Sequence, residues 1–294
     1  MNQNFWWKLV VVVVILSVII SWITIKESVS SGVDQSQTVY NKVMKSGVMN
    51  VCYLSYPPAL IKDPNTGKLS GIFYDALNKA AENMGLKTNW DVQVGWGDMI
   101  QAVNSGKCDV IGSPAWSNSL RGKSAEFSVP LYYSAINAYV RTDDYRFAGD
   151  PSVANDPQYT VVDEDGETSQ IIVQRQFSNA KVITIPQTDD VSEMLLNVIS
   201  NKADMAFVEA TVANQFLKTH PGALKIVSSM KPVAVYGNVY IVQKGQFELL
   251  TTINNAMNEL LGSGYIDQLI NQYGKNYPGG FYKVAAPYMI PTAN

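Results

Sequence analysis

The side chains that most often carry out enzyme chemistry are scarce in this chain. Its 294 residues include one histidine, His220, and two cysteines, Cys52 and Cys108. These three cannot supply the roughly four nitrogen and sulfur ligands of a structural zinc site. A serine hydrolase would depend on His220 alone, and the following Pro221 and Gly222 favour an exposed loop there. No phosphate-binding loop is present either. We therefore predict no metal, no cofactor and no catalytic residue.

The charge balance excludes another class of function. Lys and Arg total 22 and Asp and Glu total 25, which gives a net charge of -3 at pH 7. Nucleic acids bind to clusters of basic side chains, and the sequence has no such cluster, so we predict no nucleic-acid partner. The apolar fraction of 47% is enough for a full hydrophobic core.

The N-terminal segment is strongly apolar. No charged side chain occurs from Leu9 to Ile25, a length near the minimum for a helix that crosses a bilayer. Trp7 precedes the segment and Trp22 lies near its end, as aromatic residues do at membrane interfaces. We predict an uncleaved membrane anchor within residues 1–30, with the rest of the chain outside the cytoplasm. The alternative is a cleaved signal peptide, for which Ser28-Val29-Ser30 is a poor cleavage site.

Short β-rich runs alternate with amphipathic stretches in the rest of the chain, and these elements must position the polar side chains. The runs predicted as strands are 49–55, 88–92, 108–113, 159–163, 181–185 and 204–208. The stretches predicted as helices are 73–84, 97–104, 168–177, 191–200 and 210–218, with two terminal helices at 247–261 and 265–273. This order is typical of two α/β units in series, each with a mainly parallel sheet flanked by helices.

Two long extended segments, 135–141 and 233–242, connect these units. Two crossings in opposite directions would form a hinge between two lobes, and the terminal helices would then pack on the first lobe. We predict the anchor at 1–30, a polar linker at 31–43, the first lobe at 44–141 and 238–294, and the second lobe at 142–237.

Six short motifs resemble those of one protein family. They are Ser55-Tyr56-Pro57-Pro58, Gly67-Lys68-Leu69-Ser70-Gly71, Trp96 to Asp109, Arg121 to Tyr133, Gly166-Glu167-Thr168-Ser169, and Asn201 to Glu209. In this order, over about Val43 to Tyr282, the chain resembles the extracellular solute-binding proteins of family 3, the receptors of polar amino-acid ABC transporters. The resemblance implies an α/β, two-lobed type II periplasmic-binding-protein fold, whose lobes close on a small ligand at a two-strand hinge.

The resemblance also implies which residues bind the ligand. Arg121 stands at the family's carboxylate-binding arginine, whose guanidinium can donate two parallel hydrogen bonds. Thr168 stands where the family places a hydroxyl and a backbone N–H against the same carboxylate. Glu209 stands at the acidic residue that receives the ligand's ammonium group. Each of the three also has a structural explanation, as a surface arginine or as side chains at helix starts.

Three further positions match ligand contacts of the family, and one departs from its pattern. Tyr56 and Trp96 match the aromatic pair that sandwiches the ligand, and Ser113 matches a contacting serine, although core packing would also explain them. Trp116 takes the place of a small hydroxyl residue that donates to the carboxylate, and Pro114 removes a backbone donor. We infer a ligand that is small, bound differently, or not an α-amino acid, unless Trp116 is simply a core residue.

The two cysteines fall in the first and third predicted strands, which this fold places side by side. A disulfide is permitted outside the cytoplasm. Neighbouring parallel strands rarely give the required Cβ geometry, so we expect Cys52 and Cys108 to be buried free thiols, with a disulfide as the alternative.

Together these features predict a non-enzymatic, monomeric receptor held to the membrane by its N-terminal helix. It would capture a small solute, an amino acid or related carboxylate, outside the cell for an ABC permease. Two alternatives remain. Divergent relatives accompany periplasmic quinoprotein dehydrogenases as interaction modules. Others resemble cyclohexadienyl dehydratases, in which case Glu209 would serve as the general acid.

Overall fold

A computed structural model describes residues 15–17, 21, 38–147, 149–187, 190–228, 231–277 and 280–285. The described residues of Ser46–Asn294 form one compact unit, and those up to Lys45 belong to a separate unit that holds most of helix α2 (Val39–Ser46). Within these ranges no helix is both long and apolar enough to cross a membrane. The anchor predicted within residues 1–30 lies outside the described residues, apart from 15–17 and 21.

The first lobe contains the first predicted α/β unit. Its elements are β1 (Val48–Tyr53), α3 (Ile72–Asn83), β4 (Lys87–Gln93), α4 (Met99–Asn104) and β5 (Val110–Trp116). Strand β1 pairs in parallel with β4 on one side and β5 on the other. The apolar positions of α3 recur at helical spacing, so one face, which includes Phe73 and Leu77, is buried.

The second lobe repeats this arrangement. Its elements are β8 (Thr160–Glu164), α5 (Thr168–Gln176), β9 (Lys181–Ile185), α6 (Glu193–Ile199), β10 (Met205–Glu209) and α7 (Ala210–Thr219). Strand β8 pairs in parallel with both β9 and β10. The carboxyl ends of β8 and β10 therefore lie at the same edge of the sheet, where open α/β sheets bind their ligands.

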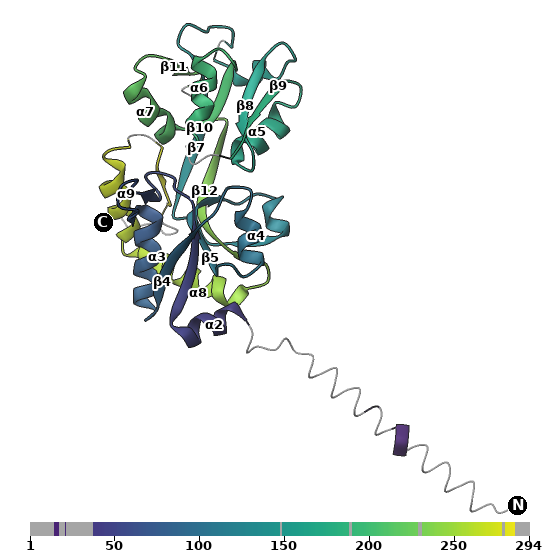
Figure 1. The fold of residues 1–294 in the computed structure, drawn as a ribbon, viewed down its shortest axis with the longest axis vertical. Helices are drawn as coiled ribbons and strands as arrows, with labels where there is room; N and C mark the ends of the chain where they lie inside the picture. The colour runs from purple at the N-terminus through teal and green to yellow at the C-terminus, as the bar shows by residue number, and fades with distance from the viewer. Residues whose placement is uncertain are drawn as a thin grey trace, which may run out of the picture. The chain divides into compact units, whose positions relative to one another are not determined.

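Two long antiparallel strands, β7 (Tyr132–Arg141) and β12 (Ala234–Gln243), connect the lobes (Figure 1). They continue the hydrogen bonding from one lobe to the other, in the order β4-β1-β5-β12-β7-β10-β8-β9. Helices α8 (Phe247–Gly262) and α9 (Tyr265–Gly274) contact α3, so the chain returns to the first lobe as predicted. Because β7 and β12 serve both lobes, the predicted residue boundaries between the lobes stay a prediction.

Short elements complete the fold. They are β2 (Ile61–Lys62), β3 (Leu69–Ser70), the 3-10 helices η2 (Arg121–Lys123) and η3 (Pro151–Ala154), β6 (Ala125–Phe127), β11 (Leu224–Ile226) and β13 (Tyr282–Lys283). Of these, η2 matters most for function because it begins with Arg121.

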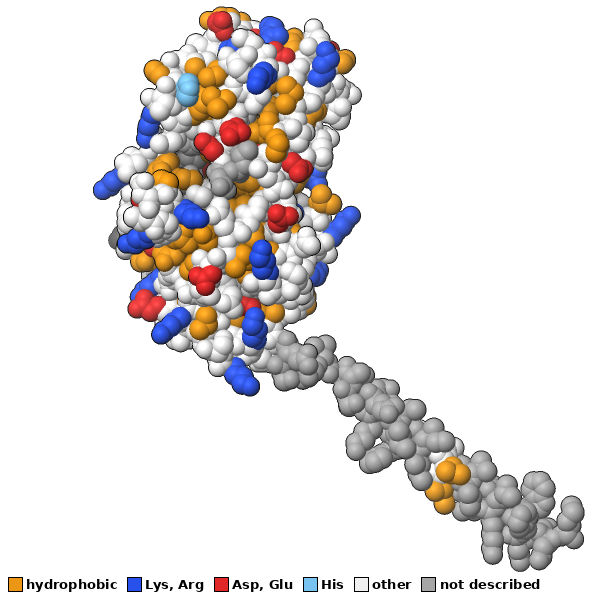
Figure 2. Space-filling view, viewed as in Figure 1, with side chains coloured by type: hydrophobic (Ala, Val, Ile, Leu, Met, Phe, Trp, Pro, Cys, Tyr) orange, Lys and Arg blue, Asp and Glu red, His pale blue; other side chains and the backbone are white. Residues whose placement is uncertain are grey.

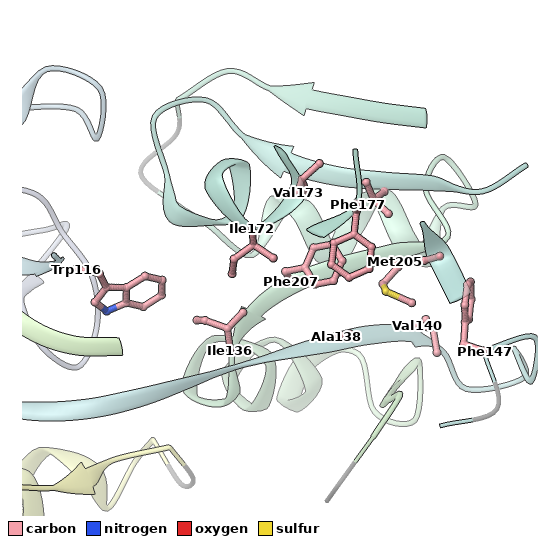
Figure 3. Close-up of a cluster of buried hydrophobic side chains, with 12 residues drawn as sticks. Trp116, Ile136, Ala138, Val140, Phe147, Ile172, Val173, Phe177, Met205 and Phe207 are labelled. Atoms are coloured by element: carbon pink, nitrogen blue, oxygen red, sulfur yellow. The ribbon is translucent and has the colours of Figure 1, made fainter. Parts of the chain in front are cut away.

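A cluster of buried apolar side chains fills the second lobe (Figure 3). It includes Phe177 and Phe207, whose ring centroids lie 4.4 Å apart. Trp116 belongs to the same cluster although it ends β5 of the first lobe, and it lies at the end marked by Ile136 and Ile172. Its indole therefore packs on the apolar interior of the second lobe, and only 6% of the residue is exposed.

The expectation of two free thiols is wrong. Cys52 and Cys108 form a disulfide, with their Cα atoms 5.6 Å apart. Cys52 lies in β1, but Cys108 precedes β5, which begins only at Val110. The side chain of Cys108 is therefore free of the strand geometry on which the expectation was based.

Candidate functional site

A small cavity lies between the lobes, and its free volume is about 10 Å³, which is room for about one water molecule. The residues that line it are Tyr56, Trp96, Pro114, Trp116, Arg121, Glu167, Thr168, Glu209 and Asn238. Six of the seven residues predicted to contact a ligand are in this set, and Ser113 is absent from it. The first lobe supplies one side of the wall, the start of α5 and the end of β10 supply the other, and β12 contributes Asn238.

Ser113 is turned toward the backbone of its own lobe. It is fully buried, and its hydroxyl donates to the carbonyl oxygen of Leu54 and accepts from the backbone N–H of Leu54, both at 2.7 Å. Both hydrogen-bonding roles of the hydroxyl thus tie β5 to the chain just after β1. The structure places Ser113 outside the cavity.

Glu209 ends β10 and precedes the first residue of α7. Its side chain does not cap a backbone N–H of that helix and faces hydroxyl groups instead. Ser134 donates to Oε1 at 2.8 Å and Thr211 donates to Oε2 at 3.2 Å. Burial raises the pKa of Glu209 to about 7, because it disfavours the charged form more than hydrogen bonds from Ser134, Thr211 and Tyr56 favour it. Glu209 can therefore hold or release a proton near neutral pH.

Arg121 links the two lobes. Its Nη1 donates to the carbonyl oxygen of Trp116 at 3.2 Å, and its Nη2 donates to the carbonyl oxygen of Gly166, in the second lobe, at 2.9 Å. Burial lowers the pKa of Arg121, and the nearby charge of Glu167 partly offsets this effect. A guanidinium remains protonated under such conditions.

Glu167 and Thr168 begin helix α5. The Glu167 carboxylate caps the helix by accepting the backbone N–H of Ser169 at 2.5 Å, and Thr168 is the first helical residue. Both residues are buried, with 5% and 3% of their surfaces exposed. Glu167 is not among the residues predicted from the sequence to contact a ligand, although it is an acidic side chain within the Gly166–Ser169 motif.

Aromatic rings form the rest of the wall. Tyr56 and Trp96 meet edge to face, with ring centroids 5.5 Å apart and planes at 88°. Trp116 stacks on Tyr236 at 5.1 Å, so the neighbouring ring covers part of its surface. Burial, together with the nearby carboxyl groups of Glu209 and Glu167, raises the pKa of Tyr56 well above its usual value. Its hydroxyl is therefore neutral and can donate a hydrogen bond.

A buried chain of hydrogen bonds connects Trp116 to Glu209. The indole Nε1 of Trp116 donates to Oδ1 of Asn238 at 2.8 Å. Nδ2 of Asn238 donates to Oγ of Ser134 at 2.8 Å, and Ser134 donates in turn to Glu209. Asn238 lies on β12 and Ser134 on β7, the hinge strands, where no motif marked them in the sequence.

The lobes touch each other at Gly166. This residue has a φ of 74°, and a Cβ atom built on it would lie 2.6 Å from the backbone nitrogen of Gly97 in the first lobe. The backbone N–H of Gly97 also donates to Oε1 of Gln187, from the second lobe, at 3.1 Å. The structure is thus a closed form, and glycine at position 166 permits the close approach.

His220 lies away from the cavity. It follows α7, stacks on Phe216 and remains visible at the surface, where it is the pale blue side chain in Figure 2. In the described part of the chain, no group of three or more His, Cys, Asp or Glu side chains could hold a metal ion.

Comparison with known proteins places these features in context. Residues 49–276 match the bacterial extracellular solute-binding proteins, family 3. A probable histidine-binding protein of Campylobacter jejuni is 25% identical over 223 residues, which cover 74% of this chain and 81% of that protein. The L-cystine-binding protein TcyA of Bacillus subtilis is 19% identical and covers 80% of this chain and 84% of its own length.

Solved structures give the same result for the fold. The ancestral amino acid-binding protein AncCDT-1, a precursor of cyclohexadienyl dehydratase, superposes with a TM-score of 0.69 at 25% identity. The match covers 80% of this chain and 99% of that one. The cysteine-binding protein from Campylobacter jejuni has a TM-score of 0.71 at 18% identity, covering 84% of this chain and 100% of its own.

Proposed function

Because this chain belongs to the bacterial extracellular solute-binding proteins of family 3, we propose that it is an extracytoplasmic receptor that closes its lobes on one small amino compound. The family and the two-lobed type II fold predicted from the sequence are confirmed. Family members form the ligand site by closing two lobes about a hinge.

The observation that carries this proposal is the composition of the cavity wall. Residues from both lobes and from distant parts of the sequence line one buried space, where Glu209 can receive an ammonium group and aromatic rings bury apolar area. The free volume of the cavity is only about 10 Å³ in this closed form, so a solute can fit only if the wall residues give way, which favours a small solute. The proteins named above as binders of histidine, cystine and cysteine support an amino compound.

The finer parts of the proposal concern partners and location. We propose that the receptor acts as a monomer and delivers its solute to an ABC permease. A helix within residues 1–30 would hold it to the outer face of the membrane, and a cleaved signal segment would give the same location without the tether. A receptor with two closing lobes is suited to this task, since closure buries the ligand and presents a distinct surface to a partner.

A dehydratase is the second candidate, because the pKa of Glu209 near 7 suits a general acid. The substrates of cyclohexadienyl dehydratases are carboxylic acids, and the buried Glu167 carboxylate in the wall opposes such ligands. The receptor is therefore the function that the site supports best. Incubation of the chain with cyclohexadienyl acids, followed by detection of aromatic products, tests the alternative directly.

Calorimetric titration of the full chain tests the receptor. The protein is purified in mild detergent, unfolded and refolded to remove any bound solute, and titrated with the twenty amino acids and a set of simple amines. We expect binding at micromolar or lower dissociation constants for at least one compound, and a large loss in Glu209→Gln. Glu248→Gln is the matched control, because Glu248 is exposed at the start of α8. Failure of every compound to bind to well-folded protein would refute the proposal.

A further inference from the structure

Pro114 and the side chain of Trp116, at the end of strand β5, offer no free hydrogen-bond donor to a ligand carboxylate. Pro114 lines the cavity and has no backbone N–H. Trp116 also lines it, and the only polar atom of its side chain, Nε1, already donates to Asn238 at 2.8 Å. The wall that would hold a carboxylate from this side is therefore a pyrrolidine ring and an indole.

Arg121, the remaining cation of the wall, is already engaged on both terminal nitrogens. Nη1 and Nη2 donate to the carbonyl oxygens of Trp116 and Gly166, at 3.2 and 2.9 Å. These bonds hold the guanidinium against the backbone of both lobes. They use two of its five N–H donors and fix its orientation, which restricts how a ligand carboxylate could form the usual two parallel bonds.

Glu167 places a negative charge beside the guanidinium. Glu167 lines the cavity and is buried, and its charge is close enough to Arg121 to raise the pKa of that group. The charges of Arg121 and Glu167 offset each other, so a second carboxylate brought by a ligand would find no net positive charge to stabilise it in a poorly hydrated space. The wall thus already contains a carboxylate that competes for Arg121.

Glu209, in contrast, lacks a cationic partner. Its carboxylate contacts the hydroxyl groups of Ser134 and Thr211, and no lysine, arginine or histidine in the described ranges forms an ion pair with it. Tyr56, Trp96 and Trp116 add aromatic surface to the same cavity, and aromatic faces attract organic cations. An ammonium group is the one charged ligand group that this arrangement stabilises.

We propose that the cavity selects a small amine that carries no carboxylate, with its ammonium group on Glu209 and its carbon skeleton against the aromatic rings. Thr168, at the start of α5, can contact a hydroxyl or another neutral polar group of the same ligand. This inference rests on the proposed receptor function and narrows its ligand class.

Matched pairs of compounds test the inference, since each amino acid has an amine that differs only by the missing carboxylate. The pairs are ethanolamine with L-serine, cysteamine with L-cysteine, and histamine with L-histidine. Each compound is titrated calorimetrically into the full refolded chain at pH 7.5. We expect at least one amine to bind 10-fold or more tightly than its parent amino acid, an effect in the range of one unfavourable charge contact.

The Glu167→Gln variant gives a result that a merely structural role would not produce. Glutamine keeps an oxygen that can accept the Ser169 N–H, so the helix cap can remain. We expect the amine to lose affinity and its parent amino acid to gain it, so that their affinity ratio falls about 10-fold. The exposed Glu248→Gln control should leave the ratio unchanged.

The outcomes separate this inference from the proposed function. Tighter binding of the amino acid in every pair that binds, or an unchanged ratio in Glu167→Gln, overturns the inference and leaves the receptor intact. Silence of all three amines overturns it as well. If the twenty amino acids are then also silent, the receptor function falls with it.

Discussion

Replacing Glu209 with glutamine should change how the stability of the protein depends on pH. Glu209 is 3% exposed, and burial raises its pKa from the ordinary value of 4.5 to about 7. The groups that face it are the hydroxyls of Ser134 and Thr211, the phenols of Tyr56 and Tyr132, and the Glu167 carboxylate. Both phenols have raised pKa values and stay neutral below pH 9, so Glu167 is the one charged neighbour among them.

The magnitude follows from the difference between the folded and unfolded pKa of Glu209. Below about pH 4.5 the carboxyl is protonated in both states and contributes nothing. Between pH 4.5 and 7 the unfolded chain releases this proton and the folded chain keeps it, so the free energy of unfolding falls as pH rises. The total loss is about 3 kcal/mol, since one pKa unit corresponds to roughly 1.4 kcal/mol. Above pH 7 the loss stays constant.

Urea denaturation between pH 4 and pH 9 measures this effect. The free energy of unfolding is compared at each pH for the original chain and for Glu209→Gln, so that contributions from all other titrating groups cancel. We expect the difference to shift in favour of the variant by about 3 kcal/mol between pH 4.5 and pH 8. Glu248→Gln, the exposed control, should give a difference that hardly changes with pH.

A difference between the original chain and Glu209→Gln that stays constant across this range would refute the reasoning. It would mean that Glu209 titrates at its ordinary pKa in the folded protein. The carboxylate would then be well solvated, and the buried cavity described above would be open to water.

Three other changes have defined outcomes. Reducing the disulfide, or replacing both cysteines in Cys52→Ser/Cys108→Ser, should lower the free energy of unfolding by up to about 4 kcal/mol, because the bond closes a loop with a sequence separation of 56. Urea denaturation measures this loss of stability. An unchanged denaturation midpoint would contradict the prediction. Ser113→Ala should lower the free energy of unfolding by about 1–3 kcal/mol, because it leaves the buried backbone groups of Leu54 without their partner. The ligand affinity measured by calorimetry should not change. Weaker binding at unchanged stability would instead make Ser113 a ligand contact. Gly166→Ala should weaken ligand binding, measured by calorimetry, about 10-fold or more, because the new Cβ would lie 2.6 Å from the backbone nitrogen of Gly97 in the closed form. Equal affinity of the variant and the original chain would show that closure does not need this contact.

Sequence alone was sufficient for the order of the elements. The apolar periodicity of α3 and the β-rich runs at β1 and β5 are local properties, and hydrophobic burial acts on them in the same way in any α/β fold. The motifs also directed attention to six residues that line the cavity, because short segments at the ends of strands carry both the chain reversal and the ligand groups.

Contacts between distant segments could not be predicted in this way. The hydrogen bond from Trp116 to Asn238 joins residues 122 positions apart, and Ser113 binds the backbone of Leu54 from 59 positions away. Which hydroxyl faces a ligand and which faces the backbone depends on side-chain direction. The disulfide likewise depended on Cys108 lying just outside its strand.

The sequence by itself determined the family, the two α/β lobes and two of the charged residues at the cleft, Arg121 and Glu209. Only the tertiary structure decided what those charges do. It placed Arg121 against two carbonyl oxygens and Glu167, and it left Glu209 among hydroxyl groups in a buried space. The physical reason is that a charge is defined by residue type, whereas its partners and its desolvation arise only when both lobes are packed together.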